Sequence, residues 1–123
     1  MKRVKNSKNK IRLIRHKRIR SRLTGTAKRP RVSVFRSLRQ MTLQLIDDSK
    51  SSTICQVNTS KLAKGDAGER KAKTAVAYLA GKELAEVAIK KGVKTALFDR
   101  GGYKYHGRVK AVAEGLRDGG LQI

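Results

Sequence analysis

The chain has 123 residues, with 31 Lys or Arg against 9 Asp or Glu, which gives a formal net charge of +22. Ordinary small soluble domains carry a net charge of about 2 to 8. No apolar run reaches the roughly 18 to 20 residues of a membrane span, and no apolar segment follows the charged first residues, so we expect neither a transmembrane helix nor a secretory signal. One cysteine and two histidines exclude an internal disulfide and a Cys/His zinc site.

The positive charge is concentrated near the N-terminus. Residues 1–46 contain 16 Lys or Arg and no carboxylate, whereas residues 47–123 contain 15 basic and 9 acidic residues. Such a run of like charge repels itself unless a dense polyanion neutralises it, so a nucleic acid is the leading partner. A change in composition separates an expected basic arm, residues 1–28, from an expected domain, residues 29–123.

The first expected element is a basic helix over residues 10–23. Its apolar residues recur close to one helical stripe, and arginines fill the remaining circumference: Ile11, Ile14, Ile19 and Leu23 against Arg12, Arg15, Arg18 and Arg22. RNA or DNA, an anionic membrane and an organellar targeting role compete for such a helix. We favour the nucleic acid, because a membrane helix needs a broader apolar face and a transit peptide needs more Ser. Residues 2–9 are expected to order only on binding.

Three strands are expected next, over residues 31–36, 42–46 and 53–57. Each is rich in β-branched or aromatic residues, and the polar turns between them are short, which predicts an antiparallel meander. Val32 and Val34 share one face of the first strand, and Thr53, Cys55 and Val57 share one side of the third. Cys55 is predicted to be a small core residue, because neither a His nor a helix start lies near it to activate the thiol.

A long helix, a strand and a last helix complete the expected fold. Small and apolar residues recur in steps of four within residues 67–91, residues 93–98 form the strand, and the last helix ends at Gly119. A helix between the third and fourth strands is a crossover, so the fourth strand lies parallel to another. The fold class is therefore α/β, with helices packed on a mixed sheet and a basic helical arm. We expect three aromatic residues in the core: Phe35, Tyr78 and Phe98.

The loop over residues 98–110 could suggest an enzyme. Gly102 and Gly107 have the spacing of a nucleotide-binding loop, but the Lys-Ser/Thr pair that such a loop requires is absent. Asp99 and His106 could form an acid–base pair, yet no nucleophile accompanies them, and Asp99 beside Arg100 is better read as a salt-bridge partner. We therefore expect neither catalysis nor a cofactor or metal.

The same loop is better suited to a polyanion. Gly101 and Gly102 allow the backbone to approach a phosphate closely, and cations follow at Arg100, Lys104, Arg108 and Lys110. Tyr103 and Tyr105 alternate with these cations, and their rings either stack on unpaired RNA bases or pack on the sheet. His16 is predicted to face RNA as a further donor, and His106 to be a hydrogen-bonding loop residue.

Several segments together resemble the bacterial large-subunit ribosomal protein family numbered eighteen. They are the basic helix, Arg29-Pro30-Arg31, Phe35-Arg36-Ser37, Gln44 with Ile46-Asp47-Asp48, and above all the run from Phe98 to Leu121, which contains Asp-Arg-Gly-Gly-Tyr-Lys-Tyr-His-Gly-Arg. The resemblance covers nearly the whole chain. Two positions differ from the family pattern: Thr42 stands where Tyr is common, and Ile123 where Phe is common.

The resemblance implies a structural protein without enzymatic activity. Such a protein binds 5S ribosomal RNA, helps attach it to the 23S-type RNA in the central protuberance, and lies beside the family-five ribosomal protein. It acts in the ribosome of the cytoplasm or of an organelle, with no membrane, no small-molecule substrate and no homo-oligomer. The implied RNA contacts are Arg15, Arg18, Arg20, Arg22, Arg29, Arg31, Arg36, Ser37, Arg100, Tyr103, Tyr105, His106 and Arg108, to which the residues themselves add Arg12, His16, Gly101 and Gly102.

Two alternatives of other classes stay open at this point. A nucleoid-type protein would bind duplex DNA as well as structured RNA. An RNase-H-like enzyme would need a cluster of metal-binding carboxylates, for which nine scattered acids offer little material.

Overall fold

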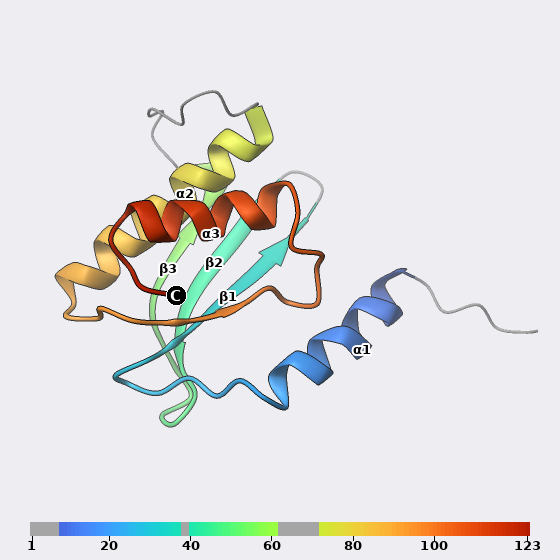
Figure 1. The fold of residues 1–123 in the computed structure, drawn as a ribbon, viewed down its shortest axis with the longest axis horizontal. Helices are drawn as coiled ribbons and strands as arrows, with labels where there is room; N and C mark the ends of the chain where they lie inside the picture. Colours follow the sequence, from blue (N-terminus) through green and yellow to red (C-terminus); the bar gives the residue numbers. More distant parts are fainter. Residues whose placement is uncertain (1–7, 38–39, 62–71) are drawn as a thin grey trace, which may run out of the picture.

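The computed structural model describes residues 8–37, 40–61 and 72–123 (Figure 1). In these residues the elements are α1 (Lys8–Arg20), β1 (Arg31–Arg36), β2 (Met41–Asp47), β3 (Ser52–Asn58), the short 3-10 helix η1 (Thr59–Lys61), α2 (Ala72–Lys90), β4 (Leu97–Asp99) and α3 (Arg108–Asp118). The predicted α/β class is confirmed. The expectation that residues 2–9 order only on binding lies outside the described residues as far as residue 7, whereas Lys8 and Asn9 already belong to α1. The predicted helix start at residue 67 also lies outside the described residues. No described helix has the length and apolarity to cross a membrane.

The sheet has four strands in the order β3-β2-β1-β4. β1 pairs antiparallel with β2, and β2 with β3, which confirms the predicted meander. The crossover through α2 returns the chain to β1, where β4 pairs in parallel from Arg31↔Leu97 to Ser33↔Asp99. β4 is shorter and later than the predicted strand over 93–98, because Thr95 and Ala96 pair with Gln122 instead of β1.

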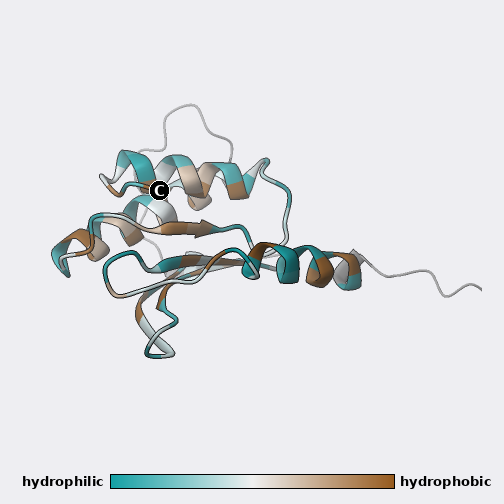
Figure 2. Ribbon diagram, turned by 60° about the horizontal axis from the view of Figure 1, so that its bottom comes forward, coloured by the Kyte–Doolittle hydropathy of each residue, from teal (hydrophilic) through white to brown (hydrophobic). Residues whose placement is uncertain are grey.

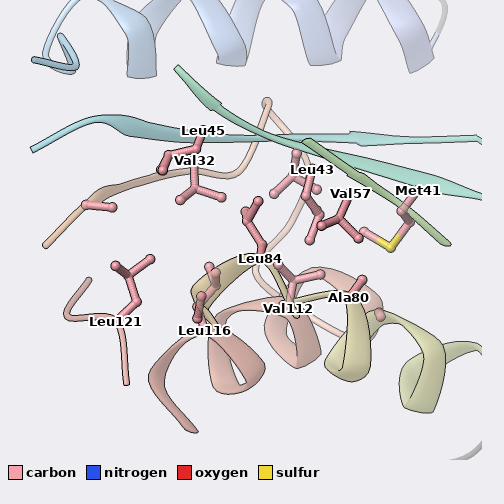
Figure 3. Close-up of a cluster of buried hydrophobic side chains, with 14 of the residues drawn as sticks. Val32, Met41, Leu43, Leu45, Val57, Ala80, Leu84, Val112, Leu116 and Leu121 are labelled. Atoms are coloured by element: carbon pink, nitrogen blue, oxygen red, sulfur yellow. The ribbon is translucent and has the colours of Figure 1, made fainter. Parts of the chain in front are cut away.

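One face of the sheet is covered by α2 and α3 (Figures 1 and 3). Side chains from the strands, such as Val32 and Leu43, point toward Leu84, Val112 and Leu116 of the helices, and all five are fully buried (Figure 3). The two helices cross at glycines: a Cβ on Gly81 would overlap the carbonyl oxygen of Val112, and one on Gly115 that of Tyr78. The helices therefore touch backbone to backbone.

Two predictions about the strands are wrong. Phe35, predicted to be a core residue, is 56% exposed, because it occupies the face of β1 opposite Val32 and Val34. Thr53 does not share a face with Cys55, because a bulge between the Leu45 and Ile46 pairings places one extra residue in β3. Cys55 does pack against the core, as predicted, and burial raises the pKa of its thiol. Tyr78 is buried, and Phe98 packs at the edge of the core.

Candidate nucleic-acid interface

Two carboxylates and one arginine form a buried ionic cluster at the end of β4. Asp99 is fully buried, and its Oδ2 lies 2.8 Å from Arg31 Nη1 and 3.0 Å from His16 Nε2. Its Oδ1 accepts the Gly101 N–H at 2.9 Å. Arg31 also donates from Nε and Nη2 to the two oxygens of Asp48, at 3.1 Å each. Asp99 is thus a salt-bridge partner, as predicted, but of Arg31 and His16 and not of Arg100.

The cluster shifts the pKa of both carboxyl groups downward. Burial alone would raise the pKa of Asp99, but the hydrogen bonds from Gly101, His16 and Arg31 outweigh it, so the pKa is lowered. The pKa of Asp48 falls to about 2, chiefly through its hydrogen bond from Arg31, with a further bond from the Gly25 N–H and the charge of Arg20. Both groups are therefore ionised at neutral pH.

Helix α1 contacts the domain through polar side chains. Arg12 Nη1 donates to the Gly101 carbonyl at 2.8 Å, His16 meets Asp99, and Arg20 Nη1 lies 3.4 Å from Asp48. These residues are spaced by four and form one stripe of the helix. The apolar stripe of α1 is not its contact surface, because Ile11 and Ile14 are exposed. The hydrophobic residues of α1 appear as brown bands on its ribbon in Figure 2. The reason is that the surface beneath α1 presents carboxylates and a carbonyl, which need donors.

A glycine allows the close approach of α1. Gly102 has φ +79°, and a Cβ there would overlap the carbonyl oxygen of Arg12 and crowd the backbone nitrogen of His16. Only a residue without a side chain fits between the loop and the helix. Gly102 thus serves the approach of α1 in the structure, and its role in the approach of a phosphate stays a prediction.

The two loop tyrosines have different surroundings. The Tyr103 ring is buried, and the guanidinium groups of Arg12 and Arg36 each lie over it, 4.8 Å from its centroid. Its hydroxyl bonds both the N–H and the carbonyl of Arg36, at 3.1 Å. Tyr105 is exposed, meets Phe98 edge to face, and accepts a hydrogen bond from Arg117. Tyr103 therefore packs at the end of β1, and Tyr105 is the ring that solvent reaches.

A groove of about 1130 Å³ lies between α1, the end of β1, the loop after β4 and the start of α2. Among the described residues, its lining includes six Lys or Arg side chains and no carboxylate: Arg12, Arg15, Arg36, Lys73, Lys104 and Arg108. The pKa of Arg108 is lowered, first by burial and then by the nearby charge of Arg36. Like charges are thus crowded together, and a polyanion in the groove would relieve their repulsion.

The predicted site residues fall into two groups. Some have their polar atoms engaged inside the protein, as described for Arg12, His16, Arg20, Arg31 and Tyr103. Others present polar groups to the groove or to solvent: Arg15, Arg18, Arg22, Arg29, Arg36, Tyr105, His106 and Arg108. Of the remaining predicted residues, Gly101 and Gly102 are buried under α1, and Arg100 and Ser37 are half-buried.

Sequence reasoning missed the contribution of α2 to the groove. Lys73 and Thr74 line it from the first turns of this helix. Arg70, Lys71 and Lys73 place three cations within four residues, which is a signal that could have indicated a basic surface. In the described part of the chain, no group of three His, Cys, Asp or Glu is placed to hold a metal ion.

The ionic cluster predicts a loss of stability in acid. A folded-state pKa below the unfolded value means that the ionised Asp48 and Asp99 stabilise the protein at neutral pH and that this contribution is lost in acid. For Asp48 the loss falls between about pH 4 and pH 2. For Asp48 alone the loss is about 2 kcal/mol, from a pKa of about 2. Urea unfolding at pH 7, 4 and 2.5 measures it. Asp48→Asn should flatten the decline, and an equally steep decline in this variant would contradict the assignment.

An α/β domain with a basic groove and a docked basic helix has the features that are typical of polyanion-binding proteins. A family profile described as ribosomal L18 of archaea, bacteria, mitochondria and chloroplasts matches residues 6–123. The chain is 46% identical over 119 residues to the large ribosomal subunit protein uL18 of Staphylococcus saprophyticus. It is 47% identical over 122 residues to the large ribosomal subunit protein uL18 of Lactobacillus johnsonii. Both alignments cover 97% of this chain and 98% of the relative. The chain is 46% identical to the uL18 protein of Ruminiclostridium cellulolyticum, with the same coverage.

The chain therefore belongs to the ribosomal protein L18 family. It is a structural protein of the large ribosomal subunit, not an enzyme, and in bacteria this places it in the ribosomes of the cytoplasm. The predicted family, the absence of enzymatic activity and the ribosomal location are confirmed, and both alternative classes are set aside.

Proposed function

We propose that the chain binds 5S ribosomal RNA and helps attach it to the 23S-type RNA in the central protuberance, beside the family-five ribosomal protein. The basic groove carries this proposal. Its six cations come from α1, the end of β1, the start of α2, the loop after β4 and the first residue of α3. No carboxylate among the described lining residues opposes a phosphate backbone. A rigid arrangement of cations from several elements recognises a folded RNA by the positions of its phosphates.

The residues of the interface have two roles in this proposal. The exposed and groove-lining cations meet phosphates, among them Arg15, Arg36 and Arg108. Arg12, Arg20 and Arg31 hold α1 and the loop in place through the carbonyl and carboxylates that they contact, although hydrogens left over on their guanidinium groups can still reach RNA. Tyr105 offers an exposed ring for an unpaired base.

A competition assay at about 150 mM salt tests the proposal, because nonspecific phosphate contacts are already weakened in this range. Labelled 5S ribosomal RNA is bound to the full chain and challenged with excess duplex DNA and with unrelated RNA. Retention of the 5S RNA supports the proposal. Equal competition by every polyanion would leave only a charge-driven association and would contradict it.

Replacing Tyr105 by leucine should weaken 5S RNA binding by roughly 5- to 150-fold, the value of one stacked base, and should leave duplex DNA binding unchanged. The ring is exposed, so stability should change little. Titrations of both nucleic acids with the variant and the parent protein measure this. Equal loss on RNA and duplex would show that Tyr105 does not stack on a base.

Replacing Gly102 by alanine should also weaken 5S RNA binding, by roughly 5- to 150-fold, because the added methyl group displaces α1 from the loop. Gly92 provides the matched control: its φ is +85°, and a Cβ there meets nothing within 4 Å. Gly92→Ala should therefore suffer the same backbone strain without loss of RNA affinity. Protease cleavage in α1 of the RNA complex should rise only in Gly102→Ala, and equal behaviour of the two variants would contradict the docking.

A further inference from the structure

The face of the sheet opposite α2 and α3 carries an exposed aromatic side chain. Phe35 projects from the end of β1, beyond the pairing with β4, which stops at Ser33. At 56% it has the largest exposed fraction of any large hydrophobic residue in the described chain. A single exposed apolar side chain is common on protein surfaces, so the surroundings of the ring decide whether it is a binding site. The sheet positions the ring rigidly, because β1 is paired along its whole length with β2.

Two rows of neutral polar side chains lie beside this ring. In one row Phe35 pairs with Thr42, whose Oγ1 accepts a hydrogen bond from Asn58 Nδ2 at 3.2 Å. In the next row Ser33 pairs with Gln44, whose Nε2 donates to Gln56 Oε1 at 3.0 Å. Each amide keeps further donors and acceptors beyond these bonds. The face thus combines a flat apolar ring with groups that hydrogen-bond in a plane.

The charges around this face favour a nucleic acid. Helix α1 lies on this side of the sheet, away from α2 and α3 (Figure 3). Asp99, which pairs with Ser33 of β1, and Asp48, which follows β2, are both engaged by Arg31. Arg36, the next residue after Phe35, lines the basic groove and stacks on Tyr103. The groove and the open face therefore meet at the end of β1, so one RNA strand can continue from one to the other.

A protein partner fits this face less well. The core of a protein interface is built from several contiguous apolar or aromatic residues. Around Phe35 the neighbours across the strands are hydroxyl and amide side chains, and no second aromatic ring is exposed on β1, β2 or β3 in the described residues. A single ring within a polar field is instead the arrangement that holds one nucleobase, by stacking on its face and hydrogen bonding to its edge.

We propose that the open face of the β-sheet around Phe35 is a binding site for an unpaired RNA base, which stacks on the Phe35 ring. The polar rows of β2 and β3 contact the edge of that base. This site is distinct from the groove, which it meets at the end of β1, and it binds the same RNA, so the proposal rests on the proposed RNA-binding function. The sequence pattern alone does not show it, because Phe35 reads as a core residue.

The test compares Phe35→Leu, which keeps an apolar side chain without a ring, with Phe35→Trp, which keeps a stacking surface. The probe is a 5S RNA transcript with 2-aminopurine at single-stranded loop positions. Phe35→Leu should weaken binding by roughly 5- to 150-fold. It should also relieve the quenching of one 2-aminopurine. The dependence of affinity on salt concentration should stay unchanged, because no charge is removed. Phe35→Trp should retain affinity and quenching. Ile89→Ala, which removes an exposed apolar residue from α2, should have no effect.

The outcomes separate the two proposals. Equal binding by the leucine, tryptophan and parent proteins would overturn the stacking site while leaving the 5S RNA assignment intact. Quenching of a short single-stranded RNA by the parent and not by Phe35→Leu, without preference for 5S RNA, would support the site and overturn the assignment. If RNA binding is unchanged and sedimentation shows a dimer that depends on Phe35, the stacking site is overturned. The face around Phe35 then binds a second copy of the chain. Urea unfolding of each variant confirms that the fold is intact.

Discussion

Replacement of Asp99 by alanine should lower the free energy of unfolding by about 3 to 5 kcal/mol, the usual cost of removing one partner from a buried ion pair. Asp99 is fully buried and holds Arg31, His16 and the Gly101 N–H. Without it, a buried guanidinium keeps only Asp48, and the backbone N–H of Gly101 loses its acceptor. We expect the loss of these interactions to destabilise the junction of β4, the loop and α1, where the groove is formed.

Urea unfolding monitored by circular dichroism measures this loss. Glu86→Ala is a suitable control, because it removes a carboxylate from an exposed position of α2 and should change stability by less than about 0.5 kcal/mol. Asp99→Asn should fall between the two, since the amide keeps one acceptor for Arg31 but no charge. Similar stabilities of the alanine variants at positions 99 and 86 would show that the cluster does not stabilise the fold.

Raising the salt concentration from 50 to 200 mM should lower the affinity for 5S RNA by about 10³- to 10⁵-fold. That range corresponds to about 6 to 10 phosphate contacts, and the groove lining alone supplies six basic residues. The proposed mechanism is release of counterions from the RNA as these cations replace them. Filter binding or fluorescence anisotropy at four salt concentrations gives the slope.

Single substitutions then assign the contacts. Arg15→Ala should weaken binding of all RNAs and reduce the salt slope by about one, because Arg15 is exposed on α1 and lines the groove. Lys90→Ala, at the far end of α2, removes the same charge away from the groove and should leave the slope unchanged. An equal change in both variants would indicate a diffuse attraction and not a defined groove.

The periodic parts of the fold could be predicted from the sequence, because burial repeats every second residue in a strand and about every fourth in a helix. Val32 and Val34 on β1, and Leu84 and Ala88 on α2, are buried as their spacing requires. The contact surface of α1 could not be predicted in this way. The surface beneath the helix is made of Asp99, Asp48 and the Gly101 carbonyl, which only the folded chain brings together, and it binds the polar residues of the helix.

The candidate site was predictable in composition but not in arrangement. The sequence identified the loop cations and tyrosines, and it left open whether a tyrosine packs on the sheet. Contacts between distant segments decide this: Tyr103 bonds to Arg36, which is 67 positions away in the chain. Phe35 could not be assigned correctly either, because alternation shows which residues share a face but not which face the helices cover.

The parallel pairing of β1 with β4 has a consequence for the order of events during synthesis. α1 is made first, whereas the loop that holds it and closes the groove follows β4, some 80 residues later. A nascent chain therefore carries its densest positive charge before it has any surface that can select one RNA. During that interval RNAs can be held by charge alone, and discrimination begins only after the rest of the chain has been synthesised and folded.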